Sequence, residues 1–317
     1  MGNFVFDQPP ILSRASFDRA DEIRDDPDRM LAGWPSALIL EIDPAGRYPI
    51  NEDGSLAWRA AATVADAPPA DAVFLAHHAD TDLWTHRVRE LDGLTTDPRR
   101  GAVRLSADEA GLLVTALGLL NWHDTAQFSP VDGSRTRPAR GGWVRRNPDT
   151  GADEFPRTDP AIITVVHDGG DQILLGRQAV WPRRWYSTLA GFVEPGESLE
   201  QCVAREVREE VGITVREPRY LGSQPWPFPR SLMVGFSAIG DPTEPLRFLD
   251  GEIADAIWFH RDEVLEALDR GAEWQRGDAA DTTGAADTTD AADDQPRLLL
   301  PGSISIAHSL ITAWARG

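Results

Sequence analysis

The sequence has a single cysteine, Cys202, among its 317 residues. No internal disulfide can form, so a disulfide-stapled fold is excluded and a reducing cytoplasm is the expected location. No run of 18 or more apolar residues occurs, so we expect no membrane span. The segment Met1–Arg24 lacks the basic start and apolar core of a secretory signal peptide. An apolar fraction of 41% and a charged fraction of 26% then favour a soluble globular protein.

Positive charge is also in short supply. The chain has 31 Lys and Arg residues against 51 Asp and Glu residues, which gives a net charge of −20. A surface this acidic repels polyanions, which argues against broad, non-specific nucleic-acid binding but leaves room for a local basic patch. Arginines gather in two places, and we interpret them as solvated surface side chains: Arg135, Arg137, Arg140, Arg145 and Arg146, and then Arg183 and Arg184.

Composition and periodicity divide the chain into three segments. Residues 1–125 predict a small α+β domain, and residues 126–158 form a Pro/Gly/Arg-rich connector without clear periodicity. Residues 159–317 alternate apolar strands with helices, which is typical of an α/β domain. Within it, residues 277–294 contain only Gly, Asp, Ala and Thr, so they cannot bury apolar surface and we expect a disordered acidic loop.

Local patterns place the regular elements. Short apolar runs bounded by turn residues indicate strands at Ala37–Ile42, Ala72–Ala76, Ala161–Val166, Gln172–Leu175, Ser231–Ile239 and Ala256–Phe259. Capping residues and helical periodicity indicate a helix that begins after Ser106 with Glu109 completing a capping box, a helix at Leu199–Val211, and a terminal helix at Ser303–Ala315 capped by Ser303.

The residues best suited to chemistry are acidic and lie on the helix expected at Leu199–Val211. Glu206, Glu209 and Glu210 are spaced i, i+3 and i+4, so they project from one helix face. Like charges at this spacing repel each other, and the helix gains nothing from the crowding unless a cation binds there. Mg²⁺ and Mn²⁺ take hard oxygen ligands, so the cluster predicts a site for one of these ions. A solvated acidic helix face is the alternative.

The flanking residues fit the same interpretation. Gly191 and Gly196 bracket a loop before the helix, where glycine permits tight turns. Arg205 can pair with Glu197 and so hold this loop against the helix. Gly212 is placed to end the helix in the left-handed conformation.

Residues 191–213 match the pattern G-x5-E-x7-R-E-U-x-E-E-x-G-U, with U aliphatic, at every position. This is the Nudix box, and the chain resembles a Nudix hydrolase. The resemblance implies an α/β/α sandwich with a mixed sheet, preceded here by the smaller N-terminal domain. It implies that Glu206 and Glu210 are the main metal ligands, that Glu209 is a ligand or base, and that Glu197 supports the arginine or an outer metal.

The resemblance adds two ligands to the metal site. The backbone carbonyl of Ala190, just before the box, commonly completes such sites, and Glu252 aligns with a further metal-binding glutamate. The candidate catalytic residues are therefore Glu197, Arg205, Glu206, Glu209 and Glu210, and the candidate metal ligands are Ala190, Glu206, Glu209, Glu210 and Glu252.

A second motif, at residues 223–231, narrows the substrate. Its three prolines remove backbone donors and stiffen the segment, so Trp226 and Phe228 are presented with little entropy left to lose. A proline-rich connection that packs its aromatic rings into the core is the alternative. The pattern S-Q-P-W-P-F-P-x-S resembles the motif that sets the NADH pyrophosphatase family apart. That resemblance assigns to the dinucleotide site Gln224, Pro225, Trp226, Pro227, Phe228, Pro229, Arg230 and Ser231.

The same family implies three more contacts. Phe192 matches an aromatic residue that stacks on the nicotinamide or a base, a use that the flat face of an aromatic ring allows. Ala307 falls where a backbone contact to substrate is expected. Phe155 matches a residue that reaches the partner subunit's site, and the family suggests a homodimer.

The connector departs from the family. Many relatives carry a four-cysteine zinc ribbon there, and tetrahedral structural zinc needs four Cys or His ligands. This connector has no cysteine, and Ser129 and Asp132 stand where the first cysteine pair would be. Both are poor zinc ligands, so we predict a hairpin without structural zinc.

The expected reaction is NADH + H₂O → NMNH + AMP, with Mg²⁺ or Mn²⁺ bound by the glutamates. The same cleavage on a longer leaving group would remove an NAD cap from an RNA 5′ end. A Nudix hydrolase of ADP-ribose or of a dinucleoside polyphosphate is the other enzyme hypothesis. A nucleotide sensor without catalysis is the non-enzyme hypothesis, and the complete set of box carboxylates argues against it.

Overall fold

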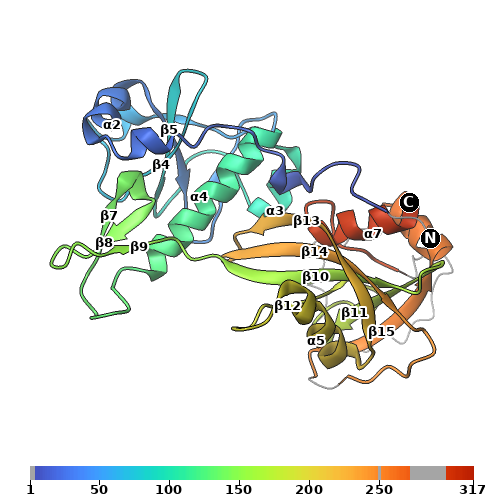
Figure 1. Cartoon of the computed structure of the whole chain (residues 1–317). Helices are drawn as coiled ribbons and strands as arrows, with labels where there is room; N and C mark the ends of the chain where they lie inside the picture. Colours follow the sequence, from blue (N-terminus) through green and yellow to red (C-terminus); the bar gives the residue numbers. More distant parts are fainter. Residues whose placement is uncertain (1–3, 249–250, 272–297) are drawn as a thin grey trace. The chain divides into compact units, whose positions relative to one another are not determined.

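The computed structural model describes residues 4–248, 251–271 and 298–317, and no helix in these ranges is long and apolar enough to cross a membrane. The chain forms two compact units, which are described separately (Figure 1). Unit 1 consists of Met1–Pro10, Asp159–Gln224 and Leu232–Gly317, and unit 2 of Ile11–Thr158 and Pro225–Ser231. The acidic loop expected at residues 277–294 lies outside the described ranges.

Unit 1 is built on a six-stranded sheet. Its strands follow the order β13-β14-β10-β11-β15, and β12 also pairs with β10. The strands are β10 (Asp159–His167), β11 (Gln172–Gln178), β12 (Leu189–Phe192), β13 (Val215–Trp226), β14 (Ser231–Gly240) and β15 (Ile253–His260). The helices are α5 (Leu199–Val211), α6 (Arg261–Asp269) and α7 (Ile306–Arg316).

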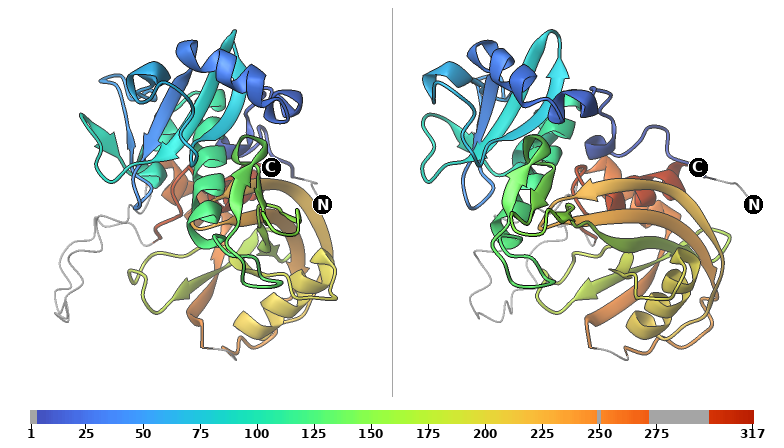
Figure 2. Two further views of the ribbon diagram at one scale, coloured as in Figure 1. Left: turned by 90° about the vertical axis from the view of Figure 1, so that its left-hand side faces the viewer. Right: turned by 60° about the vertical axis from the view of Figure 1, so that its left-hand side comes forward.

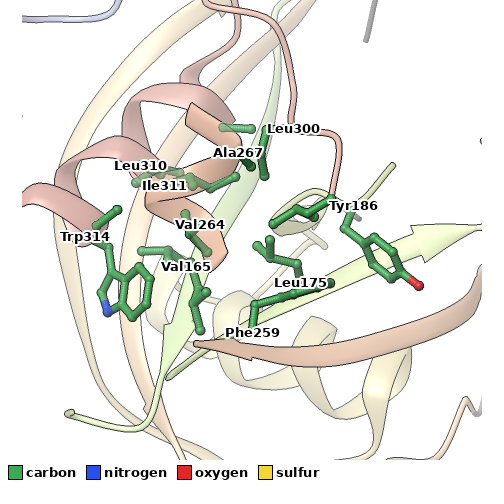
Figure 3. Packing of buried hydrophobic residues seen from close by; sticks show 14 of the residues in the cluster. Val165, Leu175, Tyr186, Phe259, Val264, Ala267, Leu300, Leu310, Ile311 and Trp314 are labelled. Carbon is green, nitrogen blue, oxygen red and sulfur yellow. The ribbon is translucent and has the colours of Figure 1, made fainter. Parts of the chain in front are cut away.

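Alternation along the strands explains why helices cover both faces of this sheet. In β10, Ile163 and Val165 pack in the cluster that contains side chains of α6 and α7. Figure 3 shows Val165 in this cluster beside Phe259 and Trp314. Their neighbours Ile162 and Val166 point the other way and pack with residues of α5. The result is an α/β/α sandwich, which confirms the predicted fold class.

The helix ends follow their capping residues. At α5, Ser198 and Gln201 form a capping box and Gly212 ends the helix with φ 79°, as the sequence predicts. At α7 the predicted cap is wrong: Ser305 caps the helix by accepting a hydrogen bond from Ala307 N, whereas Ser303 lies before it.

Unit 2 contains a four-stranded sheet in the order β3-β1-β5-β4, with α4 against it (Figure 2). The predicted capping box of Ser106 and Glu109 is present at the start of α4. The helices are α1 (Asp21–Arg24), α2 (Pro27–Gly33), α3 (Pro98–Gly101) and α4 (Ala107–Thr125), with short 3-10 turns at Ile11–Ser13, Trp34–Ser36, Ala61–Thr63, Ala102–Arg104 and Arg140–Gly142. The strands are β1 (Leu38–Ile42), β2 (Tyr48–Pro49), β3 (Arg59–Ala60), β4 (Val73–His78), β5 (Thr81–Arg87), β6 (Thr95–Thr96), β7 (Arg137–Ala139), β8 (Val144–Arg146) and β9 (Asp153–Glu154).

The arginines of the connector are not all solvated, which corrects the sequence interpretation. Arg145 is buried at 6% exposure, and its guanidinium donates to Thr136 and to His123 Nδ1 at 2.9 Å. Arg140 and Arg146 pair with carboxylates of unit 2. A buried guanidinium needs these acceptors because an unpaired buried charge costs several kcal/mol. The stretch therefore serves largely to hold the connector together.

The proline motif forms a hairpin rather than a loop of its own. β13 runs up to Trp226 and β14 begins at Ser231, which leaves residues 227–230 as the turn. The sheet order places β13 at an edge, where Pro225 can lie in a strand because a ladder hydrogen bond is not required on the open side.

Candidate functional site

Arg205 organises the acidic residues of the Nudix box. Its guanidinium makes a two-pronged contact with Glu197, at 2.6 Å from Nη2 to Oε1 and 3.0 Å from Nε to Oε2. Its Nη1 donates at 2.9 Å to both Glu206 and Glu209, and its Nη2 donates to the carbonyl of Phe192. One planar cation thus joins the loop before α5 to two carboxylates on the helix.

The same contacts shift the pKa values of these side chains. Hydrogen bonding to Arg205 lowers the pKa of Glu197 to about 2, and these contacts raise the pKa of Arg205. Glu206 behaves differently: burial raises its pKa, Arg205 opposes that shift, and the charges of Glu209 and Glu252 add to it. Glu252 thus acts on Glu206 as a like charge, and its place among the metal ligands stays a prediction.

A glycine in β12 lets Glu206 approach the backbone. A Cβ placed on Gly191 would lie 1.8 Å from the carboxyl carbon of Glu206, so a larger residue would displace that carboxylate from its position. The carboxylate therefore packs on the peptide that follows Ala190, the residue whose carbonyl the family assigns to the metal. Ala190 lies next to Gly191 in β12, and its carbonyl remains a predicted metal ligand.

The remaining box residues lie deeper. Glu210 is 3% exposed, and Cys202 is fully buried. Burial, and then a hydrogen bond to Glu197, raise the pKa of the Cys202 thiol to about 12, so it stays protonated.

The donor set suits a hard divalent cation. Glu206, Glu209, Glu210 and Glu252 supply carboxylate oxygens, and Ala190 supplies a carbonyl. In the described ranges, no three acidic, His or Cys side chains converge as a ready-made ligand set. The bonds from Arg205 to Glu206 and Glu209 account for this, because each carboxylate is turned toward the guanidinium. The residues fit the ion in chemistry, and binding it would require these two side chains to turn.

Gln224 of the second motif does not face solvent. It is fully buried, and its amide donates to Ile304 O at 2.8 Å and accepts from Ile306 N at 2.6 Å. The side chain is therefore occupied in holding the segment that leads into α7. This segment includes Ala307, whose N–H donates to the Ser305 hydroxyl at 3.2 Å.

The aromatic residues assigned to the substrate are more accessible. Phe192 is 59% exposed and Phe155 is 65% exposed. Trp226 and Phe228 meet edge to face with centroids 4.9 Å apart, and the guanidinium of Arg99 lies 4.6 Å from the Phe228 ring centre. Sequence reasoning missed Arg99 because only the fold brings it beside the motif.

The connector contains two turns of the same construction. The N–H groups of Ser129 and Asn147 donate to the carbonyls five residues ahead, and Gly133 and Gly151 donate back to them. Both glycines have φ 73°, a left-handed conformation that favours glycine. The two turns are joined by a hydrogen bond of 2.9 Å from Asn147 Nδ2 to Asp132 Oδ2.

Zinc does not fit these turns. Their side chains are Ser129 and Asp132 in one turn and Asn147 and Thr150 in the other, none of which is a cysteine or histidine. The hydroxyls and amide oxygens are used within the turns: Ser129 Oγ accepts from Val131 N, and Asn147 Oδ1 accepts from Asp149 N. A hydrogen bond from Asn147 to Asp132 joins the two turns, and neither turn has a cysteine or histidine.

Comparison with known families places both parts of the chain. A family described as "NUDIX domain" matches residues 157–277, and one described as "NADH pyrophosphatase zinc ribbon domain" matches residues 124–155. A solved structure, "Crystal structure of NUDIX hydrolase from Nitrosomonas europaea", is 21% identical, covers 43% of this chain and 78% of its own, and has a TM-score of 0.37.

Curated relatives match over almost the full length. "NAD-capped RNA hydrolase NudC" of Mycobacterium bovis is 50% identical over 99% of this chain and 97% of its own length. The protein of the same name from Mycobacterium tuberculosis is 49% identical over the same shares. "NAD-capped RNA hydrolase NUDT12" of Homo sapiens is 36% identical over 69% of this chain and 44% of its own length. With its complete Nudix box and proline motif, the chain belongs to the NAD-capped RNA hydrolase NudC family of Nudix hydrolases.

Proposed function

We propose that this protein hydrolyses the pyrophosphate bond of NAD(H), free or as the cap of an RNA 5′ end. Water adds a hydroxyl to one phosphorus, and the bridging oxygen leaves on the other phosphate. The products are NMN(H) and either AMP or an RNA with a 5′-monophosphate. The observation that carries the proposal is the joining of Glu197, Glu206 and Glu209 by Arg205, in a chain that also has the complete proline motif.

The residues of unit 1 would prepare the site for a diphosphate. Arg205 fixes the loop to α5 through Glu197, and Gly191 leaves room for the carboxylate of Glu206. Glu206, Glu209, Glu210, Glu252 and the carbonyl of Ala190 would hold Mg²⁺ or Mn²⁺. When bound, such an ion neutralises the diphosphate and lowers the pKa of a bound water. The protein's own contribution is to fix the orientation of the oxygens before substrate arrives.

Recognition of the dinucleotide would depend on aromatic surfaces. The exposed ring of Phe192 offers a face on which a base or the nicotinamide can stack. Trp226 and Phe228 form a rigid aromatic pair in the hairpin turn. A flat, pre-ordered ring loses little entropy on binding, so each of these aromatic surfaces favours contact with a planar ring of the ligand.

Three further points belong to the proposal. The connector holds no structural zinc, because its donor set is that of hydrogen-bonded turns. The protein acts as a homodimer, for which the exposed Phe155 supplies apolar surface. The single, buried cysteine favours a cytoplasmic location.

The test is substitution of the carboxylates in the full-length protein. Glu206→Gln and Glu210→Gln keep side-chain size and remove charge, so each variant is expected to fold normally and to lose turnover at least about 100-fold. The matched control is Glu200→Gln, an exposed glutamate in the first turn of the same helix. Each protein is incubated with Mn²⁺ and NADH, NAD-capped RNA or ADP-ribose, and products are separated by chromatography.

The outcomes separate the hypotheses. Wild-type cleavage of NADH and capped RNA, with loss in both site variants and none in the control, supports the proposal. A higher kcat/KM for ADP-ribose than for either NAD substrate points to the other enzyme class. NADH binding by wild-type protein without any turnover identifies a sensor and refutes hydrolysis.

A further inference from the structure

The turn of the proline motif has carbonyls that need donors. Pro225, Pro227 and Pro229 have no N–H, so the segment can make few backbone hydrogen bonds of its own. Within residues 227–230, the turn has one such bond, from Phe228 N to Trp226 O at 2.8 Å. Its shape therefore depends on groups supplied from elsewhere in unit 2.

Asn121, in the last turns of α4, supplies them. Its Nδ2 donates at 2.9 Å to the carbonyl of Pro227 and at 2.9 Å to the carbonyl of Pro229. Both hydrogens of one amide are thus used on the two carbonyls that flank Phe228. One turn earlier, Gly118 leaves the helix surface open, since a Cβ there would lie 4.0 Å from Pro227.

The orientation of that amide is fixed by its other end. Asn121 Oδ1 accepts a hydrogen bond of 2.6 Å from Arg87 Nη2 at the end of β5. Arg87 is itself held by Asp124 at 2.9 Å and by the carbonyl of Asp43 at 2.8 Å. An amide whose oxygen is engaged by arginine must present its NH₂ to the turn, so the direction of both bonds is determined.

The aromatic residue between the two carbonyls is held from the same side. The guanidinium of Arg99, in α3, lies 4.6 Å from the ring centre of Phe228. Arg99, Asn121 and the turn line one cavity of about 390 Å³ within unit 2. Side chains outside the turn therefore help to hold both the Phe228 ring and the backbone of the turn.

We propose that Asn121 is a positioning residue of the substrate site, which holds the Pro227–Pro229 turn so that Trp226 and Phe228 are ordered before the dinucleotide binds. This gives the N-terminal segment a part in recognition, through β5 and α4. The inference rests on the proposed function for the identity of the ligand. The hydrogen bonds themselves are independent of it.

Two substitutions test this role. Asn121→Leu removes both bonds to the turn and the bond to Arg87. Asn121→Asp keeps an acceptor for Arg87 but places a carboxylate oxygen against two carbonyls, so it isolates the contribution of the NH₂ group. Thr115→Val is the control, because Thr115 lies on the same helix and its hydroxyl bonds only to Gly111 O within that helix.

The expected result is a rise in KM without a matching fall in kcat. The loss of two neutral hydrogen bonds should raise KM for NADH roughly tenfold. The carboxylates that perform the chemistry belong to unit 1, so kcat and the Mn²⁺ concentration for half-activation should stay within about twofold. Hydrogen exchange at Phe228 N–H should accelerate in both Asn121 variants and stay unchanged in Thr115→Val.

The kinetic, exchange and stability measurements distinguish the results that would overturn the inference. Unchanged KM and unchanged exchange in folded Asn121→Leu and Asn121→Asp would overturn the inference. A parallel loss of kcat, Mn²⁺ response and melting temperature would assign Asn121 a purely structural role and would also overturn it. If the wild-type protein does not cleave NADH, the proposed function fails, while exchange at Phe228 and NADH binding still decide whether Asn121 orders the turn.

Discussion

Replacement of Arg205 by lysine separates the effect of charge from the effect of geometry in the Nudix box. Lysine keeps the positive charge but has one ammonium, which cannot reach Glu197, Glu206 and Glu209 together as the guanidinium does. We expect the loop before α5 to loosen and the carboxylate of Glu206 to lose its fixed direction. Stability and turnover should both fall.

The pKa of Glu197 gives the scale of the effect. It is lowered from 4.5 to about 2, mainly by Arg205, which corresponds to about 3 kcal/mol at neutral pH. This contribution is present above pH 4.5 and is lost as the pH falls toward 2, because the unfolded state then binds the proton more tightly. If lysine retains about half of it, Arg205→Lys costs about 1.5 kcal/mol and lowers Tm by roughly 3–6 °C.

The assay combines thermal unfolding at pH 7 and pH 3 with kcat for NADH in Mn²⁺. Arg208→Lys is the control, since Arg208 is exposed on the same helix. The variant should lose kcat by roughly 10-fold to 100-fold, and its Tm deficit should shrink at pH 3. A variant with wild-type Tm and kcat would refute the claim that the guanidinium geometry organises the site.

Three further predictions follow from single contacts. Gly191→Ala places a methyl group within 1.8 Å of the Glu206 carboxyl carbon, so it should reduce kcat at least about tenfold. Calorimetry should show that the variant is folded. Normal activity would contradict the proposed packing. Asp132→Ala removes the bond from Asn147 that joins the connector turns and should lower the stability of the protein in urea unfolding. Zinc chelation should leave the wild type unchanged, and zinc found at one equivalent would contradict this prediction. Burial lowers the pKa of His123 below 6.5 in the folded protein. The stability present above pH 6.5 should therefore fall as the pH drops toward the folded-state pKa of His123. His123→Gln should weaken this pH dependence in urea titrations between pH 8 and 5.

Much of unit 1 could be predicted from local sequence. The helix Leu199–Val211 has the predicted bounds because Ser198 and Gly212 cap it whatever it packs against. The α/β/α architecture follows from the near-continuous apolar run in β10, whose side chains point to both faces of the sheet and must be buried on each. The pairing of Glu197 with Arg205 was also predictable, since both belong to one contiguous motif.

Other features depend on residues that are distant in sequence. The cap at Ser305 and the burial of Gln224 are linked through the hydrogen bond from Ile306 N, which joins residues 82 positions apart. The long strand β13 has no clear apolar alternation because it lies at a sheet edge, so its pattern alone does not reveal it.

The sequence by itself determined which chemistry this chain carries, because the carboxylates, arginine and glycines of the Nudix box lie within 23 consecutive residues and one helix turn sets their spacing. Only the tertiary structure decided what orders the proline motif. Asn121 and Arg87 are unremarkable in the sequence. The helix α4 places the Asn121 amide beside a carbonyl of the turn more than 100 residues away, and β5 places the Arg87 guanidinium on the oxygen of that amide. Long-range hydrogen bonds of this kind leave no local periodicity, so they can be identified only once the backbone is in place.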